Sequence, residues 1–172
     1  MRKGYIQVYT GTGKGKTTAA LGLAIRAAGA GHKVYFAQFV KKRICSEHKA
    51  LWRFSDLITV KQFGTGFLRG HERTESERET ARRGLDEIAQ VVSSSAYDVV
   101  ILDEINVAVH AKLVDIDDLL KIICTKPPLV EIVLTGRYAD SRLVEKADLV
   151  TEMREVKHYI QKGVKARIGI EM

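Results

Sequence analysis

The sequence contains few cysteines, prolines and tryptophans: two, two and one among 172 residues. Cys45 and Cys124 lack CxxC or metal-ligand spacing, which argues against a disulfide framework and favours two reduced thiols in the core or at the surface. No apolar run approaches the roughly 20 residues that span a membrane, and the chain enters a strand-like segment without a signal peptide. These absences predict a cytoplasmic protein with no membrane association.

Positive charge is in excess, with a formal net charge of +7 at pH 7. The densest basic groups, residues 41–43 and 82–83, are not interleaved with the aromatic residues that stack on nucleic-acid bases. The charge therefore favours a solvated basic surface with an anionic ligand or an acidic protein partner, and makes nucleic acid an unfavoured partner.

Strand-like and helix-like segments alternate along the chain. Apolar runs predict strands over residues 4–10, 33–39, 57–63, 97–104, 129–136 and 148–153, the last of them buried. Helices are predicted over residues 16–31, from Thr74, from Asp115 or Asp117 to 123, and over 141–147, with Thr74 and Glu77 forming a capping box. Strands that are apolar throughout indicate a mostly parallel sheet of about six strands, covered by helices on both faces.

The stretch "TGTGKGKTTAA", residues 10–20, resembles a phosphate-binding loop with displaced glycines. The usual pattern is G-x-x-x-x-G-K-[ST], and its first glycine falls on Thr10 here. A strand before the stretch, a helix after it and an intact GKT indicate nucleotide binding in a single RecA-like phosphate-loop domain, residues 1–172, of the α/β class. The residues predicted to bind the nucleotide are Gly11, Thr12, Gly13, Lys14, Gly15, Lys16, Thr17 and Thr18.

Two acids end the predicted strand 97–104, and Arg137 follows the end of the strand 129–136. Ligands of parallel sheets bind beyond the carboxyl ends of the strands, so these residues and the loop should converge. Asp103 and Glu104, with the Thr17 hydroxyl, are candidate ligands of Mg²⁺ or Mn²⁺, and Arg137 is a candidate phosphate donor. Glu104 is equally placed to orient a water molecule, as in an ATPase. The five histidines show no ligand spacing.

The chain resembles the phosphate-loop corrinoid adenosyltransferases nearly end to end, and three long stretches carry the resemblance. Residues 11–34 are similar to that family's nucleotide loop and first helix, including the displaced glycines, and residues 99–109 to its acid-pair strand. Residues 134–171 resemble its C-terminal third and form the most specific match. Thr65–Phe67 resembles the start of its corrin-facing loop.

The resemblance implies an enzyme whose substrates are ATP and a reduced corrinoid. In this family ATP lies reversed in the loop, Co(I) attacks the ribose 5′ carbon, and triphosphate leaves. The products would be adenosylcobalamin, or a related adenosylated corrinoid, and triphosphate. Lys16, Thr17 and Glu104 then take the lysine and metal roles, and Arg26 and Arg137 lie near the nucleotide. Phe67 presents an apolar surface to the corrin.

The resemblance also implies a homodimer, and the positive charge suits an acidic flavoprotein reductant.

The sequence departs from the family on the corrinoid side. Three residues precede the first predicted strand, where members often carry an N-terminal extension; Arg69 stands at a usual tryptophan position, and residues 38–47 lack a usual glycine. Two alternatives stay open. One is a RecA-like ATPase in which Glu104 activates water, with nucleic acid on its basic surface. The other is a non-catalytic, ATP-dependent corrinoid carrier.

Overall fold

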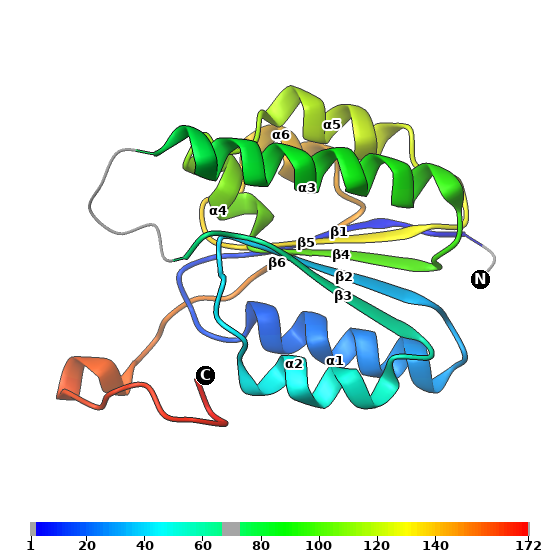
Figure 1. The fold of residues 1–172 in the computed structure, drawn as a ribbon. Helices are drawn as coiled ribbons and strands as arrows, with labels where there is room; N and C mark the ends of the chain where they lie inside the picture. The colour runs from blue at the N-terminus through cyan, green and yellow to red at the C-terminus, as the bar shows by residue number, and fades with distance from the viewer. Residues whose placement is uncertain (1–2, 67–72, 172) are drawn as a thin grey trace.

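A sheet of six parallel strands runs through the centre of the computed structural model, which describes residues 3–66 and 73–171 (Figure 1). The strand order is β3-β2-β4-β5-β1-β6. The strands are β1 (Ile6–Thr10), β2 (Val34–Phe39), β3 (Ile58–Phe63), β4 (Val99–Asp103), β5 (Glu131–Thr135) and β6 (Leu149–Glu152). The parallel sheet of about six strands predicted from the sequence is confirmed.

Helices cover both faces of the sheet, as predicted (Figure 1). The helices α1 and α2 lie on one face, and α3, α4, α5 and α6 lie on the other. Their bounds are α1 (Lys16–Gly29), α2 (Ser46–Leu51), α3 (Glu75–Ser94), α4 (Ile105–His110), α5 (Ile116–Cys124) and α6 (Ser141–Lys146), with 3₁₀ turns η1 (Trp52–Phe54) and η2 (Tyr159–Lys162). Among the helices of the described ranges, none is both long and apolar enough to cross a membrane.

The predicted helix caps are present. Thr74 accepts a hydrogen bond from the Glu77 N–H, and the Glu77 carboxylate accepts one from the Thr74 N–H, which completes the capping box of α3. Asp115, rather than Asp117, caps α5. These short polar side chains satisfy backbone N–H groups that have no partner within the helix.

Two predicted features are wrong in detail, and two short helices were missed. The last strand forms, but all four residues of β6 are exposed, because β6 is an edge strand that pairs with β1 alone. The fourth strand ends at Asp103, and Glu104 instead caps the short helix α4 in a left-handed conformation with φ 60°. The helices α2 and α4, of six residues each, were not predicted.

Gly84 of α3 packs directly on Phe63 at the end of β3 and provides a test of core packing. A Cβ added at Gly84 would lie 2.5 Å from the Phe63 Cγ atom, whereas one added at the exposed Gly22 of α1 would meet nothing within 4 Å. We expect Gly84→Ala to destabilise the protein by about 1–3 kcal/mol through overpacking. Gly22→Ala should stabilise it by about 0.5–1 kcal/mol through helix propensity.

Urea unfolding of the two variants measures both changes in the free energy of unfolding. Each glycine lies in the interior of a helix, Gly22 in α1 and Gly84 in α3. A Gly84→Ala protein that gained as much stability as Gly22→Ala would contradict the close packing of α3 on Phe63.

Candidate active site

The loop between β1 and α1 turns sharply at two glycines. Gly11 has φ 97° and Gly15, the residue that caps α1, has φ 118°, both in the region that glycine adopts without strain. Lys16 is only 8% exposed, and its ammonium donates hydrogen bonds of 2.7 Å to the carbonyl oxygens of Gly11 and Gly13. The lysine charge is therefore held at the loop, at the start of α1, where phosphate groups bind in folds of this kind.

Gly13 also contacts the chain after β6, which the sequence did not reveal. Its N–H donates a 2.6 Å hydrogen bond to the carbonyl oxygen of Met153, just after β6. A Cβ added at Gly13 would lie 2.8 Å from that oxygen, and one added at Gly11 would lie 2.4 Å from it. The alternating glycines thus allow the chain after β6 to lie directly against the loop.

Asp103 is fully buried at the end of β4 and accepts three hydrogen bonds. Its Oδ1 atom accepts from the hydroxyl groups of Thr17 (2.8 Å) and Thr135 (2.7 Å), and its Oδ2 atom accepts from the Gln38 amide (2.9 Å). The start of α1 and the ends of β2, β4 and β5 meet at this carboxylate. The predicted convergence of the loop, the acid pair and the end of β5 is confirmed.

Glu104 lies at the same edge and faces several charges. Its N–H donates to the Thr135 hydroxyl at 3.1 Å, and its carboxylate lies 3.7 Å from the Lys41 ammonium. Burial, and then the neighbouring Asp103 carboxylate, raise the pKa of Glu104 above its usual value. Burial, and then the Arg137 guanidinium, lower the pKa of Lys16. Perturbed acids and bases gathered at one sheet edge are typical of functional sites.

The two predicted arginines lie in different places. Arg137 is exposed directly after β5, close enough to affect the pKa of both Lys16 and Glu104. Arg26 is in the last turn of α1, about 15 Å along the helix axis from Lys16 at 1.5 Å per residue, and its charge acts on Tyr9. The structure therefore groups Arg137, but not Arg26, with the acid pair. Phe67 and Arg69 lie outside the described residues.

Polar residues of the neighbouring strands join this cluster without having been predicted. The Gln62 amide of β3 donates to the Gln38 side chain at 3.0 Å, and Gln38 in turn donates to Asp103. Gln38 is the one polar residue in the fully buried strand β2, a signal that the sequence did carry. Lys41 carried no such signal, because its contact with Glu104 exists only once β2 and β4 are paired.

Cys45, Glu47 and His48 bring a sulfur, a carboxylate oxygen and an imidazole nitrogen within 4.8 Å of one another. No spacing in the sequence had indicated this. The His48 Nδ1 atom accepts a hydrogen bond from the Cys45 N–H, and Cys45 is the capping residue of α2. The thiol and the imidazole are thus used to begin a helix. Both cysteines are free, in agreement with the sequence.

The donor atoms at the carboxyl edge suit a hard divalent cation beside a phosphate group. The Thr17 hydroxyl and the carboxylates of Asp103 and Glu104 supply oxygen ligands, which Mg²⁺ and Mn²⁺ prefer. Lys16 and Arg137 supply positive charge nearby. The arrangement has the parts needed to hold a metal-bound triphosphate.

The chain is similar to known proteins over nearly its whole length. The family model described as ATP:corrinoid adenosyltransferase BtuR/CobO/CobP matches residues 2–172. A corrinoid adenosyltransferase of Pseudomonas aeruginosa is 34% identical over 170 residues, covering 98% of this chain and 84% of that protein. One of Escherichia coli K12 is 34% identical over 169 residues, covering 98% and 86%. The corrinoid adenosyltransferase CobA of Salmonella typhimurium is 31% identical over 169 residues, covering 98% and 86%.

Proposed function

Because the chain belongs to the ATP:corrinoid adenosyltransferase family, its reaction is the adenosylation of a reduced corrinoid, and we propose that the edge around Asp103 binds the ATP. The observation that carries this proposal is the contact of the Thr17 hydroxyl with Asp103, 2.8 Å apart, at the first turn of α1. The loop, the lysine and the acid pair then act on one triphosphate.

The reaction forms one bond and breaks one bond. The Co(I) centre of the corrinoid substrate gives its electron pair to the ribose 5′ carbon, and the bond from that carbon to the α-phosphate oxygen breaks. Triphosphate leaves with the electrons of that bond. No side chain of the protein is needed as nucleophile, so the protein contributes positioning and charge.

Lys16 stabilises the departing triphosphate. Its ammonium, now held by the carbonyl oxygens of Gly11 and Gly13, lies at the loop where phosphate oxygens bind. Arg137, beyond β5, adds a second cation. Positive groups fixed before the reaction stabilise developing negative charge without reorganisation.

Magnesium is the proposed cofactor, and manganese is expected to replace it. When bound, the ion neutralises part of the triphosphate charge. The Thr17 hydroxyl and the Glu104 carboxylate would hold it. Asp103, which was also predicted as a ligand, already accepts three hydrogen bonds and would instead fix the Thr17 hydroxyl in place. Lys41, 3.7 Å from Glu104, keeps that carboxylate near the loop.

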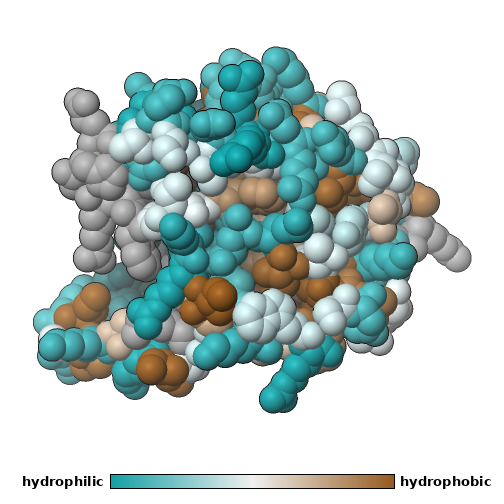
Figure 2. Space-filling model, in the orientation of Figure 1, coloured by the Kyte–Doolittle hydropathy of each residue, from teal (hydrophilic) through white to brown (hydrophobic). Residues whose placement is uncertain are grey.

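The corrinoid side of the site is proposed from the family resemblance. Phe67 would present an apolar ring to the corrin, and an acidic flavoprotein would deliver electrons to this protein of net charge +7. A homodimer in the cytoplasm is proposed as well. The homodimer is supported by the exposed apolar surface of the C-terminal segment, where Val156 is 96% and Ile168 is 81% exposed. Figure 2 shows hydrophobic groups over this segment.

The products of ATP test the proposed function. With MgATP and a chemically reduced corrinoid, we expect intact triphosphate to form in step with a cobalt–carbon bond. Phosphate analysis by ³¹P NMR and the absorbance of the adenosylated corrinoid measure the two products. Release of ADP and orthophosphate at a rate independent of the corrinoid would overturn the proposal in favour of the ATPase. Tight corrinoid binding without either reaction would favour the carrier.

A further inference from the structure

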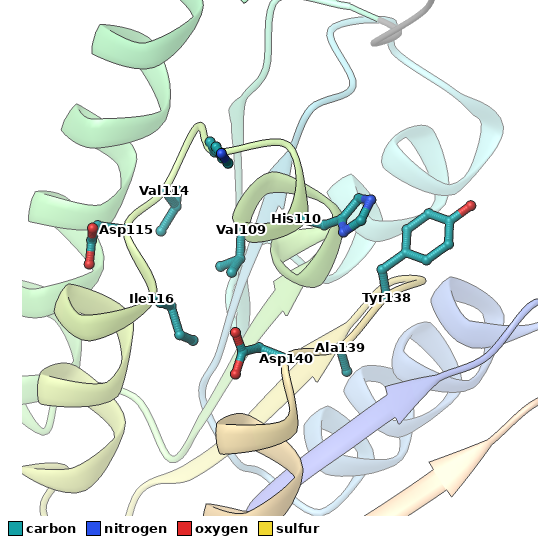
Figure 3. Close-up of a pocket in the computed structure, with 9 residues that line it drawn as sticks. Val109, His110, Val114, Asp115, Ile116, Tyr138, Ala139 and Asp140 are labelled. Atoms are coloured by element: carbon teal, nitrogen blue, oxygen red, sulfur yellow. The ribbon is translucent and has the colours of Figure 1, made fainter.

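A cavity of about 710 Å³ opens beside the nucleotide loop, between the end of α4, the α4–α5 connection and the β5–α6 connection (Figure 3). Its walls are mainly apolar, with Val109, Val114, Ile116 and Ala139 among the lining residues. This volume is typical of cavities that receive a small molecule or part of a larger one. In the described part of the chain, its lining includes none of the residues assigned above to the ATP.

Two hydrogen bonds connect the cavity walls to the nucleotide loop and to α3. The Ala139 N–H donates to the hydroxyl of Thr10, the residue just before the loop glycines, at 3.4 Å. On the other side, Arg78 in the first turn of α3 donates to the Lys112 carbonyl oxygen at 2.7 Å. Tyr138, which also lines the cavity, directly follows Arg137. The cavity is therefore adjacent to the proposed ATP site and separate from it.

An aromatic pair forms one side of the opening. The rings of His110 and Tyr138 are stacked with centroids 4.4 Å apart, and Tyr138 is 56% exposed (Figure 3). Tyr138 has φ 62°, an uncommon conformation for a bulky residue. Such strained positions concentrate where a ligand is held.

Asp140 supplies a hydrogen-bond acceptor to the cavity, whose lining also includes the charged residues Lys112 and Asp115. Its Oδ1 atom accepts from the N–H of Arg142 at 2.9 Å and from the Arg142 Nε at 3.3 Å. Its Oδ2 atom accepts nothing from residues 3–66 or 73–171. These contacts with Arg142 hold the pKa of Asp140 below its usual value, so the group is a carboxylate at neutral pH.

We propose that this cavity receives a side chain from the rim of the corrinoid that ends in a primary amide, and that Asp140 accepts its N–H. The inference rests on the proposed function. Corrinoids carry acetic and propionic acid side chains around the ring, either free or amidated. The apolar walls suit the methyl and methylene groups of such a chain, and the free Oδ2 lone pairs suit an amide N–H. A free acid would instead place a second carboxylate against Asp140, a repulsive contact that confers specificity.

The test compares an amidated corrinoid with an acid-bearing one. With chemical reduction and saturating MgATP, kcat/KM for cobinamide should exceed that for cobyrinic acid a,c-diamide by about tenfold or more, as expected when a polar partner is left unpaired. Asp140→Asn keeps the cap of α6, because asparagine caps helices as well as aspartate. The NH₂ group that replaces Oδ2 can donate to a carboxylate but cannot accept an amide N–H. The variant should therefore raise kcat/KM for the acid-bearing substrate, lower it for cobinamide, and cut the ratio to about threefold or less.

Asp117→Asn is the matched control. Asp117 also binds Arg142, at 2.8 Å, and carries the same charge, but it does not line the cavity. It should leave the ratio unchanged. A ratio unaltered by Asp140→Asn, or altered equally by both variants, would overturn the inference.

Calorimetric titration of the same proteins with both corrinoids in the Co(II) state separates this inference from the proposed function. Absence of an adenosylated product from either substrate would defeat the proposed function alone. Equal affinities of the wild-type protein for the two corrinoids would defeat the proposed role of Asp140 alone.

Discussion

Replacing Lys16 with alanine is expected to lower kcat for adenosylation by about 10²–10³, the usual cost of losing one preorganised electrostatic contact. Lys16 is 8% exposed and its ammonium lies 2.7 Å from two loop carbonyl oxygens, so no solvent cation can take its place in the same geometry. The rate of triphosphate release at saturating ATP and corrinoid measures the effect.

Lys33→Ala serves as the control for Lys16→Ala. Lys33 is exposed and precedes β2, at the end of the strands opposite the loop. Its removal therefore changes the net charge by the same amount without touching the loop. Its turnover should match that of the wild type. A Lys16→Ala protein that is folded, as judged by circular dichroism, and retains wild-type turnover would remove this lysine from the mechanism.

Asp103→Asn should weaken the apparent affinity for Mg²⁺ by about 10–100-fold, the range found when a group that orients metal ligands is lost. Asparagine has the shape of aspartate, but one of its two oxygens becomes an NH₂ group. That group would face either the Gln38 amide or the hydroxyl groups of Thr17 and Thr135, all of which now donate to Asp103. Activity measured against Mg²⁺ concentration at fixed ATP reports the change.

Glu131→Gln distinguishes a metal effect from a stability effect. Glu131 is another buried carboxylate, 8% exposed at the start of β5, and it accepts hydrogen bonds from the Tyr5 N–H and the Gln7 amide. It lies at the opposite end of the sheet from Asp103. We expect Glu131→Gln to lower the unfolding temperature without altering the Mg²⁺ dependence. The same Mg²⁺ dependence in Asp103→Asn and wild type would contradict the role given to Asp103.

The parts of the fold that the sequence predicted are those with strong local signals. The strand before the loop is short and apolar, Thr74 and Glu77 carry a capping box, and prolines 127 and 128 follow α5 closely. The exposure of β6 was not predictable in this way. Its residues Leu149 and Val150 have the composition of a buried strand, but at the edge of the sheet they are 45% and 41% exposed.

The candidate site was likewise predicted only where its residues form a local motif. The loop and the acid pair were found because each is a contiguous motif at a strand end, and the rule for parallel sheets brings them together. The contacts of Gln38 with Asp103 and of Lys41 with Glu104 join residues more than sixty positions apart. They depend on the pairing of β2 with β4, which no local pattern encodes.

The contact between Gly13 and Met153 bears on how such a loop could be transplanted. Gly11 and Gly13 have no room for a Cβ against Met153, and the Thr10 carbonyl oxygen accepts a hydrogen bond from the Met153 N–H. The loop and the first residues after β6 are thus shaped by each other, although they are separated by most of the chain. A chimera that receives the loop from a protein with the common glycine spacing must also receive the segment that follows its last strand.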